Sequence, residues 1–169
     1  TLLVFAPLLF MLILWLMPSD NKRLLKLIGV LGTVIPLVLS LIIAVSGLKW
    51  SSYAVYADWF QLGNTGNEFS QMYAVPFELG IDGFSFVMIL LTAVLSTLAA
   101  IASTWQIEKG WKGYFSLFLL LETGMLGVFA AENLILFFLF FEVTLVATFF
   151  LVGKWGGFDR EKAAYRFLI

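Results

Sequence analysis

Residues 119–157 read LLLETGMLGVFAAENLILFFLFFEVTLVATFFLVGKWGG, in which two long apolar segments meet at Glu132 and Asn133. Taken with the residues before it, each segment approaches the roughly 20 apolar residues that a helix needs to cross the hydrocarbon core of a bilayer. A connection of two residues forces the helices that it joins to run antiparallel. The stretch therefore predicts a transmembrane helical hairpin.

Each apolar segment carries one acidic residue, Glu122 before the turn and Glu142 after it, and each lies ten residues from Glu132. Ten helical residues rise about 15 Å, which is about half the thickness of the hydrocarbon core. Both carboxyl groups are therefore expected near the bilayer midplane, where acidic residues usually serve ion or proton pathways. The alternative is a structural role, in which each carboxyl is protonated and hydrogen-bonded to a neighbouring helix.

The composition is that of a membrane protein. The chain is 62% hydrophobic and 12% charged, whereas soluble domains carry about 25% charged residues. It contains no Cys, which excludes a disulfide framework, a thiolate metal site and a cysteine nucleophile. It also contains no His, the commonest general base and a common ligand of zinc and haem. No metal site, phosphate-binding glycine loop or nucleic-acid motif is expected.

The hydropathy pattern predicts an all-α integral membrane fold with about five complete transmembrane helices and the start of a sixth. Residues 49–83 interrupt the pattern, because aromatic residues there mix with Asn, Gly, Gln and acids, as they do at a membrane interface. Within this segment, GNTGN at 63–67 is typical of a turn. The predicted helices are 2–17, 24–48, 84–105, 113–131 and 134–153, with the sixth starting at 163–169.

The positive charges are distributed unevenly between the loops. Nine of the ten basic residues follow the first, third and fifth predicted helices, whose ends lie on one side of the membrane. By the positive-inside rule this side is the cytoplasm or the mitochondrial matrix, and the N-terminus lies on the outer side. The chain is thus divided into residues 1–48 with helices one and two, an aromatic-rich extracytoplasmic loop at 49–83, and residues 84–169 with the remaining helices.

The two acids have different sequence neighbours. Glu122 lies close to Gly124 and Gly127, and small residues allow helices to approach closely, so a helix–helix interface is expected there. Glu142 is followed by Thr144 and Thr148. Their hydroxyl groups either bond to carbonyl groups of their own helix or line a wet path, and the sequence leaves both possibilities open.

Three stretches together resemble a known family: FELGIDGFSFVMILLTAVL at 77–95, the hairpin at 119–157, and KAAYRFLI at 162–169. In this order they are similar to the M subunit (the mitochondrial subunit 4 type) of the proton-pumping NADH–quinone oxidoreductase, respiratory complex I. The hairpin is the specific part of the resemblance. The chain has no initiator Met and stops within an apolar run, so it is expected to be an N-terminal fragment of such a subunit.

The resemblance implies an antiporter-like subunit of about fourteen helices with two inverted five-helix repeats, in which residues 84–169 begin the proton-translocating domain. It implies that Glu142 is the proton-coupling carboxyl of the fifth helix, paired with a lysine on the seventh, and that Glu122 is a secondary relay or structural acid. A lysine on the eighth helix and a charged residue on the twelfth continue the relay. Family members often have Pro five residues after the glutamate. This chain has Ala147 there, so the resemblance does not extend to a proline-dependent distortion of this helix.

The implied function is proton translocation by a subunit without a redox centre, driven by quinone reduction elsewhere in the complex. NADH, FMN, iron–sulfur clusters and quinone are expected on other subunits, and no cofactor in this chain. The implied partners are the other membrane-arm subunits and the lipids of a bacterial plasma membrane or mitochondrial inner membrane. Two alternatives stay open: a subunit of a multi-subunit sodium/proton antiporter, which the LGIDGFSF and KWGG runs disfavour, and a passive membrane scaffold.

Overall fold

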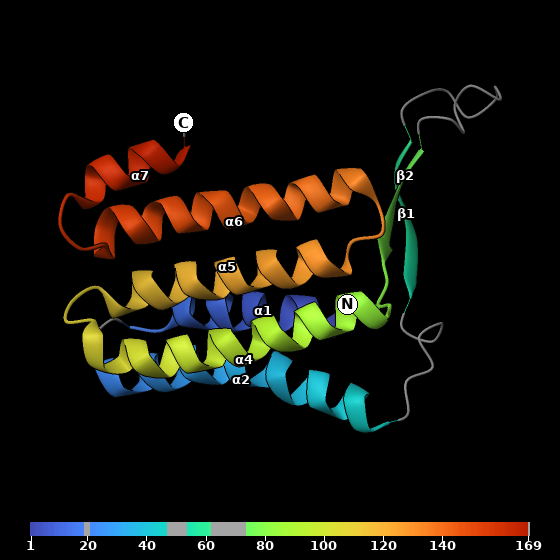
Figure 1. Ribbon diagram of the computed structural model, residues 1–169. Helices are drawn as coiled ribbons and strands as arrows, with labels where there is room; N and C mark the ends of the chain where they lie inside the picture. The colour runs from blue at the N-terminus through green and yellow to red at the C-terminus, as the bar shows by residue number, and fades with distance from the viewer. Residues whose placement is uncertain (19–20, 47–53, 62–73, 169) are drawn as a thin grey trace.

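The computed structural model describes residues 1–18, 21–46, 54–61 and 74–168 of the chain. These residues form six helices, which run side by side as a bundle, and one two-stranded sheet at the end of that bundle (Figure 1). The elements, in chain order, are α1 Leu2–Leu16, α2 Lys22–Val45, β1 Val55–Gln61, β2 Ala74–Leu79, α4 Gly83–Gln106, α5 Trp111–Ala130, α6 Leu134–Trp155 and α7 Arg160–Leu168.

Four of the described helices, α2, α4, α5 and α6, are long and apolar enough to cross a membrane. Helix α1 is also apolar but has 15 residues, fewer than the roughly 20 that a perpendicular span needs. Helix α7 starts at Arg160, slightly before the predicted start of the sixth helix. The prediction of an all-helical membrane fold is confirmed, and the helix ends differ from the predicted ends by a few residues.

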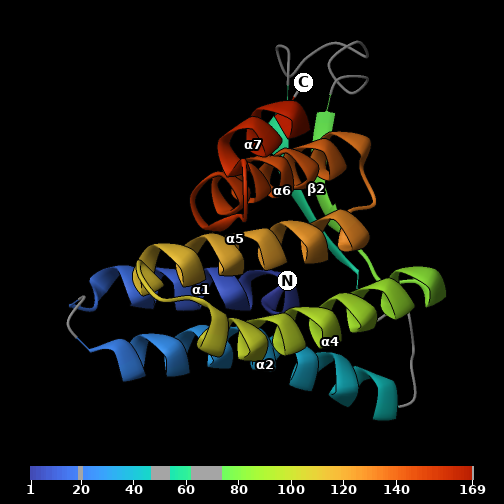
Figure 2. The same ribbon diagram turned by 60° about the vertical axis from the view of Figure 1, so that its left-hand side comes forward.

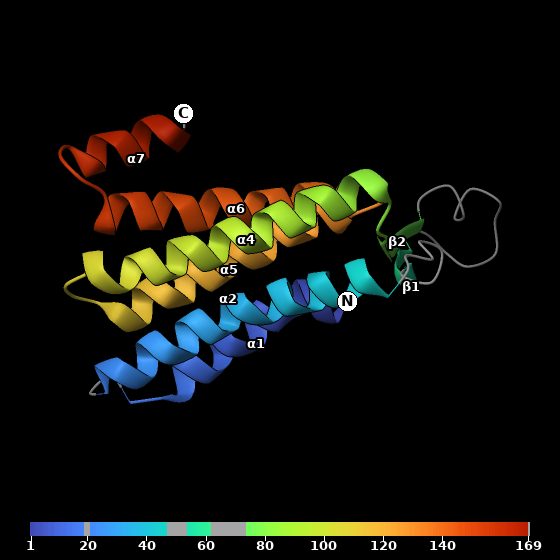
Figure 3. The same cartoon turned by 60° about the horizontal axis from the view of Figure 1, so that its bottom comes forward.

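Helix α5 is the central helix of the bundle. It packs against α1, α2, α4 and α6, whereas α6 packs on α5 from the outside and α7 folds back beside α6 (Figures 2 and 3). The burial of the two halves of the hairpin differs accordingly, because 56% of the apolar stretch of α5 is buried but only 17% of that of α6. The antiparallel hairpin that the sequence predicts therefore joins a central, mostly buried helix to a peripheral helix of which little is buried.

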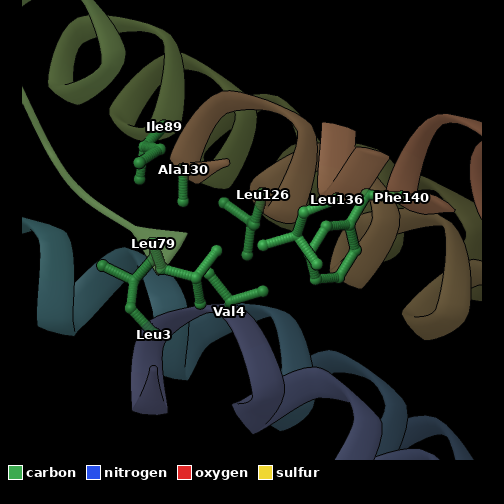
Figure 4. Close-up of a cluster of buried hydrophobic side chains, with 8 residues drawn as sticks. All are labelled: Leu3, Val4, Leu79, Ile89, Leu126, Ala130, Leu136 and Phe140. Atoms are coloured by element: carbon green, nitrogen blue, oxygen red, sulfur yellow. The ribbon is translucent and has the colours of Figure 1, made fainter. Parts of the chain in front are cut away.

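Two clusters of buried apolar side chains hold the bundle together, one towards each end. The outer cluster, at the end that carries the sheet, joins four helices and β2 (Figure 4). Its members are Leu3, Val4, Leu79, Ile89, Leu126, Ala130, Leu136 and Phe140. The inner cluster, at the opposite end, consists of Leu14, Leu25, Ala100, Trp111, Phe115, Phe118 and Leu119.

The Leu126→Ala substitution is expected to destabilise the fold by about 2–5 kcal/mol, because Leu126 is completely buried in the outer cluster and its removal leaves a cavity. Leu98 of α4 is a matched control, since 59% of its surface is exposed on the outside of the bundle. Thermal unfolding of the detergent-solubilised full-length subunit measures both effects. An equal loss of stability in the two variants would contradict the packing of the outer cluster.

Two strands form within the segment that the sequence predicts only as a loop. Strands β1 and β2 pair antiparallel, from Val55 opposite Leu79 to Gln61 opposite Ala74. The strands read VYADWFQ and AVPFEL, which alternate poorly between apolar and polar residues. Their pairing is a contact between residues distant in the sequence, so hydropathy periodicity does not reveal it. The predicted turn at 63–67 lies outside the described residues.

Strand β2 is attached to the turn between α5 and α6. The backbone N–H of Gly80 donates to the carbonyl of Ala130 (2.9 Å), and the N–H of Glu132 donates to the carbonyl of Glu78 (3.1 Å). These bonds satisfy main-chain groups that a tight turn otherwise leaves without partners. The sheet therefore fixes the end of the helical hairpin at which the turn between α5 and α6 lies.

Side chains at two helix starts accept hydrogen bonds from the first turn. Asn133 Oδ1 accepts from the N–H of Ile135 (2.8 Å) at the start of α6, and Asp82 Oδ1 accepts from the N–H of Ser85 (2.6 Å) at the start of α4. The bond from Ser85 holds the pKa of the Asp82 carboxyl below its ordinary value of 3.8. The contribution of this cap to stability is therefore complete above that value and is lost as the pH falls below it.

Candidate functional site

Glu122 is buried in the middle of α5. None of its surface is exposed, and neither carboxyl oxygen has a hydrogen-bond partner among the described residues. Buried polar atoms in proteins are nearly always hydrogen-bonded, and leaving one without a partner costs free energy. Packing alone therefore does not explain a carboxyl group at this position.

The spacing along α5 shows which way Glu122 faces. Phe115, Leu119 and Glu122 follow one another at intervals of four and three residues, so they share one face of the helix. On this face, the Phe115 ring lies where Gly29 of α2 has no side chain, and Leu119 lies against Gly32 in the same way. The carboxyl group of Glu122 therefore lies on the side of α5 that packs against α2.

A second buried polar group without a partner lies at the same depth. Ser96 of α4 is 3% exposed, and its Oγ has no hydrogen-bond partner among the described residues. Two turns away along the same line of α4, Ser103 Oγ bonds to the hydroxyl of Tyr114 on α5 (2.6 Å). The two helices run antiparallel, so seven residues back from Ser103 on α4 and seven residues forward from Tyr114 on α5 lead to the same depth, at Ser96 and Leu121. Ser96 is therefore level with Glu122.

Helix α2 contributes a third polar group at this level. Pro36 has no N–H, so it cannot donate to the carbonyl of Gly32 as a residue four positions on in a helix normally does. Gly32 contacts Leu119, and Pro36 lies one turn further along α2, in the direction that leads to Glu122 on α5. Gly32, Ser96 and Glu122 thus lie at similar depths on α2, α4 and α5, three helices that pack against one another.

Glu142 is located differently, on the outer surface of the described bundle. The buried residues of α6 are Leu136, Phe140 and Ala147, whereas the side chain of Glu142 is exposed. It makes no hydrogen bond or ion pair with any described residue. Among the residues that the structure describes, Lys162 and Asp159 form the one salt bridge. Glu142 thus lies in the middle of an apolar helix, with its side chain exposed on the surface of the described bundle.

Helix α5 separates the two acids. Gly124, two residues from Glu122 and therefore on nearly the opposite side of α5, lies against Thr144 and Phe140 of α6. The same contact places Glu122 and Glu142 at similar depths. The structure therefore puts the two carboxyl groups level with each other but on different sides of the central helix, and does not bring them into one site.

The hydroxyl groups of Thr144 and Thr148 bond to their own helix. Thr144 Oγ1 donates to the carbonyl of Phe141 (2.6 Å), and Thr148 Oγ1 donates to the carbonyl of Thr144 (2.7 Å). Of the two possibilities that the sequence leaves open, the structure shows the bonds to the helix backbone. Ala147, at the position where family members often have Pro, is buried within the continuous helix α6.

Sequence reasoning identified both acids but missed Ser96 and the Gly32 carbonyl. A signal for Ser96 was present, because Thr92, Ser96 and Ser103 follow at helical intervals of four and seven residues on an otherwise apolar helix. Among the described residues, no group of three or more His, Cys, Asp or Glu side chains could hold a metal ion.

Known proteins resemble the chain along nearly its whole length. The NADH-quinone oxidoreductase subunit M of Rhodobacter capsulatus is 40% identical over 114 residues, which are 65% of this chain and 22% of that protein. The subunit M of Rickettsia felis is 34% identical over 172 residues, which are 98% of this chain and 33% of that protein. The chain is a homologue of NADH-quinone oxidoreductase subunit M. No protein-family model matches it.

A solved structure agrees with this homology to subunit M. A chain of respiratory complex I from Thermus thermophilus with bound NADH superposes with a TM-score of 0.77 at 28% identity, over 99% of this chain and 31% of that one. The chain spans about a third of the length of the curated subunit M relatives that it matches throughout. The resemblance carried by the three sequence stretches is confirmed, and the chain is an integral membrane protein.

Proposed function

We propose that this chain forms the first part of a proton-translocating subunit, in which Glu142 is the proton-coupling carboxyl. The observation that carries the proposal is the position of Glu142, at mid-span on the outer face of α6 with no partner among the described residues. An acidic residue at the centre of a spanning helix costs about 2.5–3.5 kcal/mol on insertion scales, so such residues face protein or water rather than lipid. Proton transfer by the intact complex with Glu142 replaced tests the proposal.

The partner of Glu142 belongs to another part of the subunit. Homology to subunit M supports a lysine on the seventh helix as that partner, followed by a lysine on the eighth helix and a charged residue on the twelfth. A cation beside Glu142 stabilises its charged form, and moving the cation away releases that stabilisation. A carboxyl controlled in this way exchanges protons when the pair opens and closes, which is what a proton relay needs.

The assembly follows from the same proposal. The chain contributes no redox centre, and quinone reduction by other subunits of an NADH–quinone oxidoreductase drives its proton transfer. NADH, FMN, iron–sulfur clusters and quinone bind to those subunits. Residues 1–48 supply the first two helices, residues 49–83 lie on the outer side, and residues 84–169 begin the translocating domain. The end of the bundle opposite the sheet carries most of the basic residues, and we call it the basic end. It faces the bacterial cytoplasm or the mitochondrial matrix, and the N-terminus faces outwards.

A subunit of a multi-subunit sodium/proton antiporter is the second candidate, because it shares the antiporter-like fold and the acid on the fifth helix. The two candidates differ in what drives proton movement. Vesicles that contain the intact complex are expected to acidify when NADH is added and not when a sodium gradient alone is imposed. Sodium-driven proton movement in the absence of NADH would favour the antiporter.

Glu122 is the secondary relay in this proposal, and a passive scaffold is the third candidate. We expect Glu122→Met to raise the free energy of unfolding by about 1–3 kcal/mol, because it removes a buried carboxyl that has no partner among the described residues. The same variant is expected to lower proton pumping, since a relay needs the carboxyl. Thermal unfolding and NADH-driven acidification of vesicles measure the two effects. A scaffold acid predicts the reverse, with lower stability and unchanged pumping in the complex that still assembles.

A further inference from the structure

The basic end of the bundle contains a cavity of about 340 Å³ that the proposed function does not use. Three separate segments line it: Lys22 and Leu25 at the start of α2, residues 108–113 in the loop before α5 and in its first turn, and Lys154 near the end of α6. Its volume is within the range of about 300–1,000 Å³ that is usual for small-molecule sites. We call it the lysine cavity.

The charges around the lysine cavity are predominantly positive. Four lysines line it, namely Lys22, Lys109, Lys112 and Lys154, against a single acid, Glu108. None of them takes part in the one salt bridge of the described residues. The ammonium group of Lys112 is held in place by the carbonyl groups at the end of α1, whereas the other three lysines are exposed. The cavity therefore presents several cationic groups that no described acid neutralises.

The inner surface of the cavity is apolar. Leu25 and Trp111 line it and are 2% and 7% exposed. The ammonium group of Lys26 lies 4.0 Å from the centre of the Trp111 ring and adds a further positive charge close to the cavity. A ligand that fits must therefore carry an anionic group next to apolar groups.

The depth of the cavity in the membrane indicates where such a ligand comes from. The cavity lies at the ends of the spanning helices, where α2 and α5 begin and α6 finishes. This is the level of the lipid headgroups, and Trp111 and Trp155 lie there as tryptophans at membrane interfaces commonly do. A neighbouring hollow of about 550 Å³ shares Lys109 and Lys154 and is also lined by Arg160, which extends the cationic surface along the interface.

We propose that the lysine cavity binds the phosphate headgroup of an anionic phospholipid from the leaflet at the basic end of the bundle. The lysines contact the phosphate, and the apolar wall formed by Leu25 and Trp111 contacts the glycerol and the first carbons of the acyl chains. Basic pockets between helices on this side of a membrane are suited to anionic headgroups. The bound lipid ties α2, α5 and α6 together at an end where their loops lead to other helices, namely α1, α4 and α7.

Photocrosslinking in the intact complex tests the proposal. The probe is phosphatidylglycerol with a photoreactive group next to the headgroup, present as a minor component of phosphatidylcholine bilayers. After illumination and digestion, the yield of lipid attached to peptides that contain residues 107–113 and 154–158 is measured. The wild type is expected to crosslink in both peptides. Unlabelled phosphatidylglycerol should compete, whereas additional phosphatidylcholine and millimolar inorganic phosphate should not.

Variants identify the lysines as the cause. Each of Lys22→Gln, Lys109→Gln and Lys154→Gln is expected to lower the crosslinking yield roughly fivefold, and the triple variant about 100-fold. The matched control is the triple variant in which Gln replaces three basic residues of the same end that do not line the cavity, Arg23, Lys162 and Arg166. It removes the same number of positive charges from the same side of the membrane, and its yield should stay within about twofold of the wild type.

Three results would overturn the proposal. Equal losses in the two triple variants would show only a general attraction of anionic lipids to a positive surface. Competition by inorganic phosphate as strong as that by phosphatidylglycerol would assign the cavity to a soluble anion. A wild type without crosslinks in either peptide would show that no lipid headgroup reaches the cavity. None of these results depends on proton pumping, so the proposal stands or falls separately from the role of Glu142.

Discussion

Replacing Glu142 with Gln in the intact complex is expected to lower proton pumping by about 100-fold or more, the usual contribution of a positioned acid–base group. The amide of Gln keeps the size and much of the hydrogen-bonding capacity of the carboxyl but cannot take up and release a proton in the same way. Glu142 has no partner among the described residues and lies on the outer face of α6, so the substitution leaves the packing of the six helices intact. NADH-driven acidification of proteoliposomes measures the effect.

The control for this experiment is Glu132→Gln, which removes one acid from the turn of the same helical hairpin, outside the membrane span. It should pump like the wild type. Glu142→Asp retains the carboxyl on a shorter side chain and should recover part of the activity. NADH oxidation should fall together with pumping in the Gln variant if electron and proton transfer are tightly coupled. An assembled Glu142→Gln complex that pumps and turns over normally would refute the proposed role.

The Gly124→Val substitution is expected to prevent the hairpin from packing. A Cβ atom at Gly124 would come within 2.7 Å of Thr144 Cγ2, 3.1 Å of the carbonyl oxygen of Phe140 and 3.2 Å of the backbone nitrogen of Thr144. Two of these neighbours are main-chain atoms of α6, which cannot rotate out of the way as a flexible side chain can. We expect a cost at or above the upper end of the roughly 1–3 kcal/mol that is usual for overpacking. The amount of assembled complex on native gels measures it.

Two further variants show whether the close approach of α5 and α6 is the cause. Gly124→Ala should show a smaller defect, and adding Thr144→Ser should relieve it in part, because Ser lacks the methyl group that comes nearest. Gly83→Ala is the matched control, since a Cβ there would meet no other part of the described chain within 4 Å. It should assemble as well as the wild type. Normal assembly of the Gly124→Val complex would contradict the observed contact between the two helices.

The positions of the helices could be predicted because a bilayer sets their length. The predicted hairpin at Glu132 and Asn133 forms, and basic residues that the sequence assigns to one side of the membrane gather at one end of the bundle. The strands β1 and β2 could not be predicted in this way, since each is stabilised by the other across a gap in the sequence and by the turn that follows α5. Pairing of this kind leaves a weak local pattern.

The buried face of each helix could not be predicted from the sequence, for a different reason. In a membrane, the residues that face lipid and those that face protein are both apolar, so helical periodicity says little about which side is inside. Gly124 and Gly127 correctly indicated a close helix contact, and the structure shows that this contact is with α6. The sequence could not show that Glu122 lies on the far side of α5 from Glu142.

The sequence by itself determined the membrane class, the hairpin and the depth of its two acids, because hydrocarbon thickness and helical rise convert residue counts directly into depth. Only the tertiary structure decided which acid is buried. Glu122 lies on α5 where it packs against α2 and α4, level with Ser96, whereas Glu142 lies on the outer face of α6. The reason is that small residues on α2 and α5 fix which helix faces meet, and this depends on contacts between distant parts of the chain.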